Sequence, residues 1–505
     1  MTFQQILDGV EVLMQRGDAA VSGIEYDSRR VKPGCCFVAM QGEKTDGNRY
    51  IDAAIASGAV AIVSDSPEVT PRDKVAWAVV RHGRKALARV AASFYGRPAE
   101  KLAITGITGT NGKTTTAFIV ESILNAAGRK NALLGTIEYH VAGKVIEAPH
   151  TTPEALELMQ VFAGAVKEGA TEAVMEVSSH ALDQARVYGI PYDVAVFTNL
   201  TRDHLDYHRT FEDYFGAKSV LFEGCGTEPP RVSVLNLDDS YGTELIKRAR
   251  TKKRQAITYG LDRGDFRANK IEMGPAGTRF EMITPEAEIP IWSRLAGKVN
   301  VYNILAASAA AYARGISEHD IAAGIAKLKR VPGRFETVNM GQPFTVVVDY
   351  AHTDDALRNL TALAREFVLH AEQKGRVITV FGCGGDRDRA KRPLMGDAAG
   401  RGSDFVVVTS DNPRSEDPVA IINDALPGVQ RSGVKYAVEL DRRKAITLAI
   451  REARNGDIVL IAGKGHEKTQ TTREGVFPFD DVEVAREELV KAGYEGEPAA
   501  AEVQK

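Results

Sequence analysis

The stretch Gly106-Ile107-Thr108-Gly109-Thr110-Asn111-Gly112-Lys113-Thr114-Thr115-Thr116 decides how this chain folds. It follows the apolar run Leu102-Ala103-Ile104 and precedes a segment of helical character through Ala126. A strand, a glycine loop and a helix in this order turn backbone N–H groups and a helix N-terminus toward a phosphate. Lys113 adds a point charge, and the Thr114 hydroxyl is placed to bind Mg²⁺. The stretch therefore predicts an ATP-binding loop.

The loop departs in one place from the commonest phosphate-binding pattern. That pattern has glycine where Ile107 stands, so the loop proper is the shorter segment from Gly109 to Thr114. A tight turn with a surface lysine is the alternative, but the flanking strand and helix favour phosphate binding. The residues predicted to contact ATP in this loop are Gly109, Thr110, Asn111, Gly112, Lys113, Thr114 and Thr115.

Composition narrows the function classes. A chain of 505 residues exceeds what one core usually serves and predicts two to four domains. The formal net charge of -3 argues against nucleic acid as a partner. The 4 cysteines show no metal-ligand spacing and are too few for a disulfide framework. Because no secretory signal and no apolar run of membrane length is visible, we expect a cytoplasmic protein without membrane insertion.

The chain divides into three regions, which we place at 1–99, 100–332 and 333–505. Short strands and turns fill the first region. Its expected elements are a strand over 37–40, a helix over 51–57 and a strand over 59–63. The pattern predicts a small α/β domain.

Strands alternate with helices in the second and third regions, which is typical of mostly parallel sheets with ligands at the carboxyl ends of the strands. The expected strands are 173–177, 194–198, 233–236, 345–349, 376–381, 404–409 and 457–461, with a helix over 300–313. A polar stretch over 263–288 predicts a small antiparallel annex. The predicted fold is α/β, with a small first domain, a central P-loop domain and a C-terminal doubly wound, Rossmann-like domain.

Chemically capable side chains follow the expected strands. Glu176 ends a buried strand, and a buried carboxylate is costly without a cation, which favours a role as Mg²⁺ ligand over satisfaction by backbone donors. His204 and His208 follow the next strand and bind either a metal or a phosphate, or form polar surface. Lys218 lies in an amphipathic segment, where a lysine that extends along apolar surface to solvent is the simpler interpretation.

Together these motifs resemble those of the Mur ligases, ATP-dependent amino-acid ligases of peptidoglycan precursor synthesis. The resemblance extends over nearly the whole chain. Its motifs are Gly109 to Thr114, the Glu176 strand, Asn199…Asp203-His204-Leu205-Asp206, the Lys218 helix, Gly297…Asn300…Asn303, Val331 to Glu336, Val348 to Thr353, Asp27-Ser28-Arg29…Pro33-Gly34…Phe37 and Asp411-Asn412-Pro413-Arg414. The last two motifs are similar to the branch that adds meso-diaminopimelate to UDP-N-acetylmuramoyl-L-alanyl-D-glutamate through an acyl phosphate.

The resemblance implies roles in ATP and metal binding. Lys113 would hold the β- and γ-phosphates. Lys218 would be modified to a carbamate, an anionic oxygen ligand, which reverses the simpler interpretation above. Asn303 would meet the adenine, and Arg334 and Asp349 would close on phosphate and ribose. The implied catalytic residues are Lys113, Glu176, His204 and Lys218, and the implied Mg²⁺ ligands are Thr114, Glu176, His204 and carbamylated Lys218.

The resemblance also implies two substrate sites. Ser28 would contact the uridine. Thr151, Thr152, Ser178, Gln184 and Arg186 would bind the sugar and dipeptide, the last three on the helix after the Glu176 strand, although an exposed polar helix face is the alternative for Gln184 and Arg186. The diaminopimelate contacts would be Arg387, Asp411, Asn412, Pro413, Arg414, Gly463 and Glu467, with a plain structural loop as the alternative for the glycines. Arg414 would grip the distal carboxylate that lysine lacks.

One residue departs from the family pattern, and three other functions compete with that of a diaminopimelate-adding ligase. Asp354 stands where the family has proline, which removes a constraint on φ and restores an N–H. Folylpolyglutamate synthases lack the Asp27-Ser28-Arg29 region, lysine-adding relatives lack an arginine at 414, and a P-loop switch protein needs no loop over 411–414. We expect a monomer in which a hinge at 331–334 closes the third region on the second.

Overall fold

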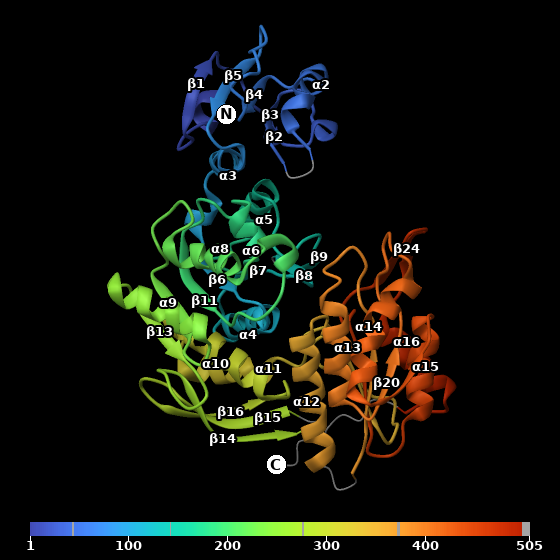
Figure 1. Ribbon diagram of the computed structural model, residues 1–505. Helices are drawn as coiled ribbons and strands as arrows, with labels where there is room; N and C mark the ends of the chain where they lie inside the picture. The colour runs from blue at the N-terminus through green and yellow to red at the C-terminus, as the bar shows by residue number, and fades with distance from the viewer. Residues whose placement is uncertain (43–44, 142, 275–276, 371–373, 497–505) are drawn as a thin grey trace.

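The computed structural model describes residues 1–42, 45–141, 143–274, 277–370 and 374–496, which form three α/β domains in chain order (Figure 1). This confirms the predicted fold class. The three sheets fix where the cores lie, whereas the domain limits at 99 and 332 stay predictions. In the described part of the chain, no helix combines the length and the apolar character needed to cross a bilayer.

The first domain is built on a five-stranded sheet in the order β1-β5-β4-β3-β2, parallel except for β1. Its strands are β1 (Val12–Arg16), β2 (Gly23–Glu25), β3 (Cys35–Ala39), β4 (Ala61–Ser64) and β5 (Ala76–Val80). Its helices are α1 (Phe3–Ile6), η1 (Ser28–Arg30), η2 (Gly47–Tyr50), α2 (Ile51–Ala56) and α3 (Gly83–Phe94). All residues of β3, β4 and β5 are buried, as expected for parallel strands covered on both faces.

The middle domain contains an eight-stranded sheet in the order β13-β12-β11-β6-β10-β7-β8-β9, in which only the β7-β8-β9 end is antiparallel. Its strands are β6 (Ala103–Thr108), β7 (Asn131–Leu134), β8 (Glu138–Val141), β9 (Lys144–Glu147), β10 (Glu172–Glu176), β11 (Tyr192–Phe197), β12 (Val232–Asn236) and β13 (Ala256–Tyr259). Its helices are η3 (Pro98–Lys101), α4 (Lys113–Ala126), α5 (Ala155–Lys167), α6 (Ser179–Asp183), α7 (Leu205–His208), α8 (Phe211–Glu223), α9 (Ser240–Thr251), α10 (Lys298–Ala313) and α11 (Glu318–Lys327).

The predicted antiparallel annex is confirmed as a three-stranded sheet below the main one (Figure 1). It consists of β14 (Arg267–Gly274), β15 (Gly277–Ile283) and β16 (Glu288–Ser293). Apolar residues of β14, β15 and α10 share one hydrophobic cluster with the P-loop helix α4. The annex therefore completes the core that supports the loop.

The C-terminal domain contains a six-stranded sheet in the order β17-β18-β22-β19-β20-β21, parallel except for the edge strand β17. Its strands are β17 (Glu336–Val338), β18 (Thr345–Asp349), β19 (Val377–Phe381), β20 (Phe405–Val408), β21 (Lys435–Val438) and β22 (Ile458–Ala462), followed by the hairpin β23 (Thr469–Thr472) and β24 (Gly475–Pro478). Its helices are α12 (Asp354–His370), α13 (Lys391–Gly402), α14 (Pro418–Ser432), α15 (Arg442–Glu452) and α16 (Asp481–Lys491).

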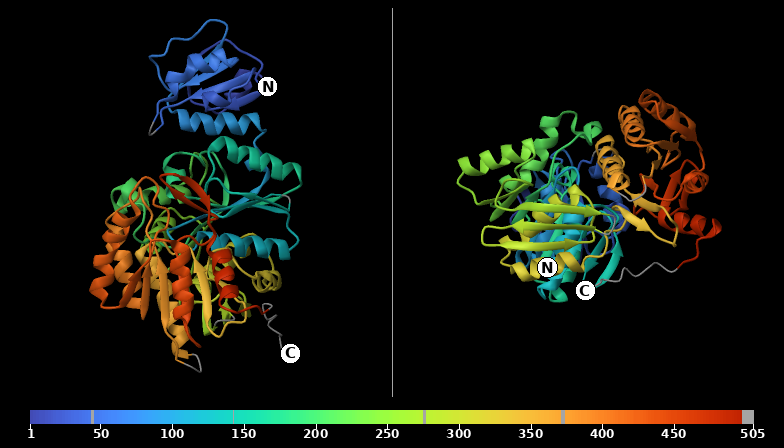
Figure 2. Two further views of the ribbon diagram at one scale, coloured as in Figure 1. Left: turned by 90° about the vertical axis from the view of Figure 1, so that its right-hand side faces the viewer. Right: turned by 90° about the horizontal axis from the view of Figure 1, so that it is seen from below.

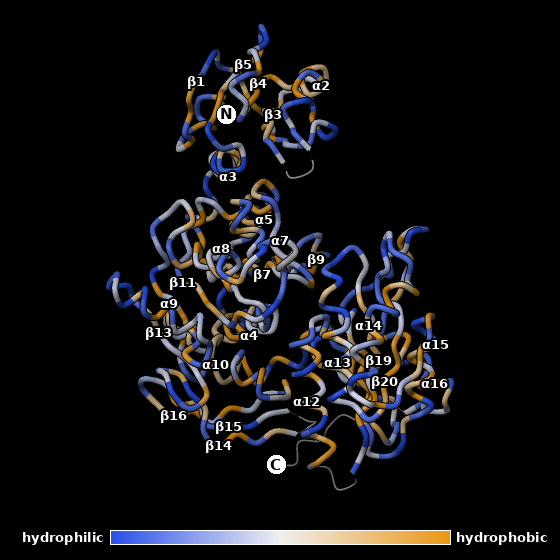
Figure 3. The backbone as a smooth tube through the Cα atoms, viewed as in Figure 1, coloured by the Kyte–Doolittle hydropathy of each residue, from blue (hydrophilic) through white to orange (hydrophobic). Residues whose placement is uncertain are grey.

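The domains are joined in two different ways. Helix α3 of the first domain packs on α5, and one hydrophobic cluster continues from Phe3 through both helices to β10. The C-terminal domain instead lies beside the middle domain and faces it across a polar cleft (Figures 1 and 2). Hydrophobic residues concentrate on the strands and inner helix faces, and the loops are largely hydrophilic (Figure 3).

Candidate active site

The phosphate-binding loop begins at Gly109, after the end of β6. This agrees with the prediction that the loop proper is the shorter segment from Gly109 to Thr114, while Gly106 belongs to the strand. Ile107 is fully buried in β6, paired with Glu176 of β10 on one side and Val196 of β11 on the other. A branched apolar residue suits a central strand, which explains why this position is not glycine.

The loop is fixed by the end of β11. Gly109 has φ +149°, and a Cβ built there would lie 1.9 Å from Thr198 Oγ1, so only glycine fits. The backbone N–H of Thr110 donates to the Asn199 carbonyl at 2.8 Å, and that of Asn111 donates to Asn199 Oδ1 at 2.9 Å. Strand β11 thus holds the loop in shape without a ligand.

Two lysines converge on the loop. Lys113 Nζ donates to the carbonyls of Gly109 and Thr110 at 2.9 and 2.8 Å, and Lys218 Nζ donates to the same Gly109 carbonyl at 2.9 Å. Lys218 is 1% exposed in α8, and its ammonium lies 4.5 Å from the centre of the Tyr214 ring. Burial and then the charge of Lys113 push the pKa of Lys218 well below its ordinary value. Lys218 is therefore no surface lysine.

A buried carboxylate lies beside the loop. Glu176 is 1% exposed at the end of β10 and accepts from Thr114 Oγ1 at 3.1 Å. Thr136 donates to it through its backbone N–H at 2.7 Å and its hydroxyl at 3.0 Å. Only one of these donors is backbone, and among the described residues no cation pairs with Glu176. The carboxylate is left with a charge that a bound cation would offset.

Histidines gather opposite this carboxylate. His204 adopts a left-handed backbone conformation, φ +53°, and its Nε2 lies 3.4 Å from Asp203 Oδ2. Its ring centre is 4.8 Å from that of His180. His208 Nε2 instead lies 2.9 Å from Ser179 Oγ inside the middle domain. Of the two histidines that the sequence left open, His204 is the one that faces the cleft.

A cavity of about 390 Å³, which we name the P-loop cavity, lies where the loop meets the C-terminal domain. Four of the predicted ATP-binding residues of the loop and all three predicted outside it line this cavity: Asn111, Gly112, Thr114, Thr115, Asn303, Arg334 and Asp349. The structure thus brings them together from both domains.

Residues of the C-terminal domain complete the P-loop cavity. Arg334 donates from Nη2 to Thr114 Oγ1 at 3.3 Å, and its guanidinium lies 4.7 Å from the centre of the Tyr350 ring. Asp349 accepts from the backbone N–H groups of Phe335 and Ala351 at 2.7 and 2.8 Å, while burial raises its pKa. Its two oxygens hold the turn that presents Arg334.

The domain junction is equally tight. Gly333 has φ +64°, and a Cβ there would lie 2.1 Å from the backbone nitrogen of His466. Its carbonyl accepts from the Tyr350 N–H at 2.9 Å, and its own N–H donates to Glu336 Oε2 at 2.8 Å. The junction passes so close to the loop after β22 that no side chain fits there.

A second cavity of about 350 Å³, which we name the Arg414 cavity, lies between the carboxyl ends of the C-terminal strands and the His204 region. Six predicted amino-acid contacts line it: Arg387, Asp411, Asn412, Arg414, Gly463 and Glu467. Pro413 is not among the lining residues. The loops after β19, β20 and β22 supply these side chains, as the switch-point rule for doubly wound sheets predicts.

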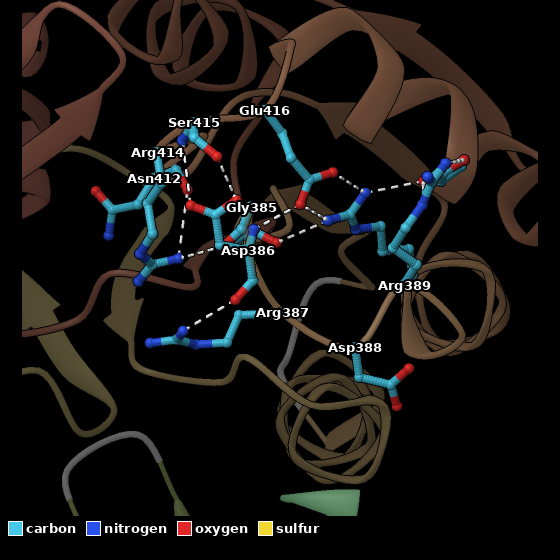
Figure 4. Close-up of polar contacts among 12 residues, drawn as sticks. Gly385, Asp386, Arg387, Asp388, Arg389, Asn412, Arg414, Ser415 and Glu416 are labelled. Carbon is cyan, nitrogen blue, oxygen red and sulfur yellow. Dashed lines mark hydrogen bonds and ion pairs between the residues drawn. The ribbon is translucent and has the colours of Figure 1, made fainter. Parts of the chain in front are cut away.

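The loop that carries Arg414 is braced from both sides (Figure 4). Arg414 has φ +52°, and its Nη1 donates to the Gly385 carbonyl at 2.7 Å. Ser415 Oγ donates to Asp386 Oδ1 at 2.6 Å. Figure 4 shows Arg387 and Arg414 extending to the same side of this loop. Two guanidinium groups therefore reach one cavity from a rigid base.

The Arg414 loop and the loop after β22 share an interlocked polar group. Asn412 Nδ2 donates to Glu467 Oε2 at 2.7 Å, and the buried Lys464 donates to Asn412 Oδ1 at 2.9 Å and to Glu467 at 3.3 Å. Gly463 has φ +119°, and a Cβ there would lie 2.5 Å from Asp411 Oδ2. The cavity thus has a cationic side and a carboxylate side.

The predicted sugar–peptide contacts form a separate cluster. Thr152 Oγ1 donates to the Glu176 carbonyl at 2.9 Å, and Arg186 Nη1 donates to the Thr152 carbonyl at 3.2 Å. Thr136 Oγ1, which donates to Glu176, lies 3.1 Å from Thr151 Oγ1. Gln184 Oε1 accepts from Arg186 Nε at 3.0 Å. The structure therefore brings Thr151, Thr152, Ser178, Gln184 and Arg186 together.

The placement of this cluster on a helix is wrong in part. Helix α6 spans only Ser179–Asp183, with Ser178 as its N-cap and Gln184 as its C-cap. Arg186 lies beyond the helix because Ala185 adopts a left-handed conformation, φ +55°, which turns the chain. Ser28 lies apart in η1 of the first domain.

Some residues that line the Arg414 cavity were not predicted as contacts. They are His180, Arg202, Asp203, Tyr350, His352, Asp354, Gly382, Gly384, Asp388, Lys391 and Met395. Tyr350 and His352 follow β18 directly, so the rule that ligands bind at the ends of parallel strands could have found them. Lys391 begins α13, and nothing in its local sequence distinguishes it from a surface lysine.

Comparison with known proteins agrees with this architecture. Three family models match in chain order: "Mur ligase family, catalytic domain" over residues 20–95, "Mur ligase middle domain" over 107–311 and "Mur ligase, glutamate ligase domain" over 333–465. The chain is 55% identical over 476 residues, 94% of each chain, to the UDP-N-acetylmuramoyl-L-alanyl-D-glutamate–2,6-diaminopimelate ligase of Solibacter usitatus. It is 46% identical over 492 residues, again 94% of each chain, to the enzyme of the same name from Geobacter metallireducens.

A solved structure agrees with these sequence matches. It bears the name UDP-N-acetylmuramoyl-L-alanyl-D-glutamate–2,6-diaminopimelate ligase, is 34% identical and superposes with a TM-score of 0.68. The match covers 98% of this chain and 99% of that one. Three consecutive family models and full-length relatives at this identity establish that the chain belongs to the Mur ligase family.

Proposed function

We propose that this chain uses ATP to join meso-diaminopimelate to the D-glutamyl carboxylate of UDP-N-acetylmuramoyl-L-alanyl-D-glutamate, releasing ADP and phosphate. The observation that carries the proposal is the pairing of two cavities in one cleft. The P-loop cavity is built for a phosphate chain, and the Arg414 cavity offers arginines and a carboxylate to an amino acid. His204 lines the Arg414 cavity from the middle domain, where the acyl group would be transferred.

The Arg414 cavity matches an amino acid with charges at both ends. Arg387 and Arg414 suit carboxylates because a guanidinium offers paired donors in one plane. Glu467 suits an ammonium group. Lysine would leave a guanidinium without its carboxylate, and a site built for a polar group discriminates strongly against an analogue that lacks it.

The residues around the loop fit Mg²⁺ and a lysine carbamate. Glu176 has a buried charge without a counter-ion, and the Thr114 hydroxyl is 3.1 Å from it. Lys218 is buried with a strongly lowered pKa, which leaves the neutral amine that forms a carbamate. Across the described ranges, no group of three or more His, Cys, Asp or Glu side chains is arranged so that it could hold a metal ion by itself. The proposed ligands are instead Thr114, Glu176, His204 and carbamylated Lys218, with phosphate oxygens. Mg²⁺ held there would offset the charge of bringing a carboxylate to ATP.

The protein's own part is to bind, orient and exclude water. Lys113 would leave the carbonyls it now contacts and hold the transferred phosphate. Arg334 reaches Thr114 from the other domain, so the phosphate site is complete only when the domains are closed. Closure excludes water, which would otherwise hydrolyse the acyl phosphate.

The UDP-linked substrate would enter from the side of the first domain. Helix α5 connects the two predicted parts of its site: Glu154, its N-cap, pairs with Arg186 at 3.0 Å, and Glu157 pairs with Arg30 at 3.3 Å. Ser28 is in the same η1 turn as Arg30. Since both cavities are completed within one chain, we infer a monomer, which acts in the cytoplasm where ATP and UDP-sugars are available.

The proposed reaction is tested by phosphate release. The enzyme is incubated with ATP, Mg²⁺ and UDP-N-acetylmuramoyl-L-alanyl-D-glutamate, and either meso-diaminopimelate or L-lysine is added. We expect release with diaminopimelate at a rate at least ~10²-fold above that with lysine. Release with lysine alone would contradict the specificity, and release with neither would contradict the ligase activity.

Replacement of Arg414 tests the amino-acid site separately. Arg414→Ala should raise the KM for diaminopimelate by about 10- to 100-fold, the effect of losing a charged hydrogen bond, and leave the KM for ATP unchanged. Arg389→Ala is the matched control, because Arg389 lies on the facing loop but pairs with Asp424 outside the cavity. Equal effects of both variants would show that Arg414 does not bind the amino acid.

A further inference from the structure

His352 is a half-buried histidine that lines the Arg414 cavity. It follows β18 and faces the middle domain across the cleft, near Asp203. Arg387 and Arg414 approach the same cavity from the loops after β19 and β20. An amino acid whose distal carboxylate is held by these arginines would turn its other end toward His352.

The hydrogen bonding of His352 fixes which ring nitrogen is available. Its Nδ1 lies 2.9 Å from the Tyr350 carbonyl. A carbonyl oxygen only accepts, so Nδ1 must carry the hydrogen, and the neutral ring has its lone pair at Nε2. Within the described residues Nε2 has no hydrogen-bond partner. The Tyr350 ring, with its centre 4.5 Å from that of His352, supports the imidazole from one side.

The surrounding charges favour a neutral ring that can become charged during reaction. Burial lowers the pKa of His352, and the cations Lys391 and Arg334 act in the same direction. The Asp203 carboxylate acts in the opposite direction and would stabilise an imidazolium once it forms. His466 is a titratable neighbour whose ring centre lies 4.8 Å from that of Tyr350, and burial lowers its pKa to about 3.

The reaction needs a proton acceptor at this place. A primary amine that attacks an acyl phosphate forms a C–N bond with its lone pair and must lose a proton to give a stable amide. Without an acceptor the nitrogen would remain positively charged, and the amine rather than phosphate would leave again. Positioned general bases contribute typically ~10²- to 10⁴-fold in rate.

We propose that His352 Nε2 accepts this proton from the attacking amine of the amino-acid substrate. The amine lone pair forms the C–N bond to the acyl carbon, and the N–H proton passes to Nε2. The bond between the acyl carbon and the bridging phosphate oxygen then breaks, and phosphate leaves with that electron pair. The proton then returns from the imidazolium to solvent or to the departing phosphate. The inference rests on the proposed function, because it requires an acyl phosphate.

Hydroxylamine distinguishes formation of the acyl phosphate from the proton transfer proposed for His352. It is largely unprotonated at neutral pH, so it attacks an acyl phosphate without a base and yields a hydroxamate that ferric ion detects. His352→Gln should keep hydroxamate formation within about 3-fold of the unaltered enzyme and lose ~10²-fold or more in diaminopimelate ligation. Raising the pH should narrow the ligation deficit, because hydroxide from solution can then accept the proton in place of the imidazole.

His466→Gln is the matched control. It replaces another histidine that contacts Tyr350 and that is not among the residues lining the Arg414 cavity. We expect its ratio of ligation to hydroxamate formation to equal that of the unaltered enzyme.

Three results would overturn the inference or its basis. Equal loss of both activities in His352→Gln would indicate a structural role. Undiminished ligation would exclude His352 as the proton acceptor. Absence of hydroxamate with the unaltered enzyme would instead contradict the acyl phosphate of the proposed function, and so would be distinguished from a failure at His352.

Discussion

Around the P-loop, the ionisable side chains of Glu176, Lys113 and Lys218 take part in no ion pair among the described residues, whereas the buried Arg392 and Arg442 of the C-terminal domain are ion-paired. Arg392 binds Glu416 and Asp424 at 2.7 and 2.8 Å, and Arg442 binds Asp481 at 2.6 Å. Charges of the first kind, those around the P-loop, are offset only when ligands bind. Charges of the second kind, those of the ion-paired arginines, hold loops in place. The comparison separates residues that serve the reaction from residues that serve the scaffold.

The largest effect is expected for a charge of the first kind. Lys113→Ala should lower kcat by ~10⁴-fold, since it removes a cation that meets the transferred phosphate. It should leave stability unchanged or slightly raised, because the lysine now contacts only carbonyls of its own loop. Phosphate release and thermal unfolding measure the two effects. The exposed Lys167→Ala is the control, and a large loss of stability in Lys113→Ala would contradict the distinction.

The opposite pattern is expected for a charge of the second kind. Arg442 and Asp481 are both fully buried, and Arg442 also donates to the carbonyls of Ser410 and Ala462 at the ends of two strands. Asp481→Asn should cost about 3–4 kcal/mol in the free energy of unfolding, because it leaves a buried guanidinium unpaired. Urea unfolding measures this cost. Glu487, the exposed partner of Arg443, provides the control. Glu487→Gln should cost no more than ~1 kcal/mol in the free energy of unfolding. Similar costs for Asp481→Asn and Glu487→Gln would refute the argument from burial.

A paired charge outside the cleft, in the middle domain, refines the comparison. His140 lies between Glu121 and Glu138 at 2.6 and 2.9 Å. Burial alone would lower its pKa, but the two carboxylates outweigh burial and raise the pKa to about 9. A raised pKa stabilises the folded state fully below the ordinary value near 6.5, and this stability is lost as pH rises through about 9.

His140→Gln should therefore unfold more easily than the unaltered protein at pH 6, by at most ~3 kcal/mol, and by much less at pH 10. The pH dependence of urea unfolding measures the difference. The exposed His319→Gln should show no such dependence. A deficit that is constant between pH 6 and 10 would attribute the effect to packing instead of charge.

The smallest effect is expected at Asp354, which lines the Arg414 cavity at the start of α12. Thr353 Oγ1 accepts from the Ala356 N–H at 3.1 Å, so Asp354 occupies the first helical position, where proline is well tolerated. Asp354→Pro removes the ion pair with Arg358, which lowers stability. It also restricts the unfolded chain, which raises stability. The net change in unfolding free energy should stay within ~1 kcal/mol, and diaminopimelate KM within about 3-fold.

Ala356→Pro is the control for Asp354→Pro, because it removes the N–H that Thr353 accepts and should cost more in thermal unfolding. If Asp354→Pro were the more damaging variant, Asp354 would have a role in the site that its contacts do not reveal.

The sequence predicts the strands and the residues that end them. Strand β18 has the predicted bounds, Thr345–Asp349, and β10 and β11 differ by one or two residues, because buried parallel strands are continuous apolar runs. The hairpin β8–β9 was not predicted. Every residue of β9 is exposed, so no alternation of apolar and polar residues marks it.

The surroundings of some site residues could not be predicted from their local sequence. Lys218 has the local pattern of a surface lysine, and its burial results from the approach of Gly109 across the sheet. Lys391 meets the middle domain only because the cleft is closed. Arg186 left its expected helix because a single left-handed residue, Ala185, turned the chain. Pairings of this kind depend on tertiary distances that periodicity does not encode.

The tight glycine at the domain junction also limits how the gene can change. Any single-base substitution that replaces glycine in the protein introduces a side chain or a stop. At Gly333 the first carbon of that side chain would lie 2.1 Å from the His466 nitrogen, and at Gly109 it would lie 1.9 Å from Thr198 Oγ1. An inhibitor that bound the backbone of these two residues would therefore meet positions at which resistance cannot arise by point mutation without loss of the enzyme.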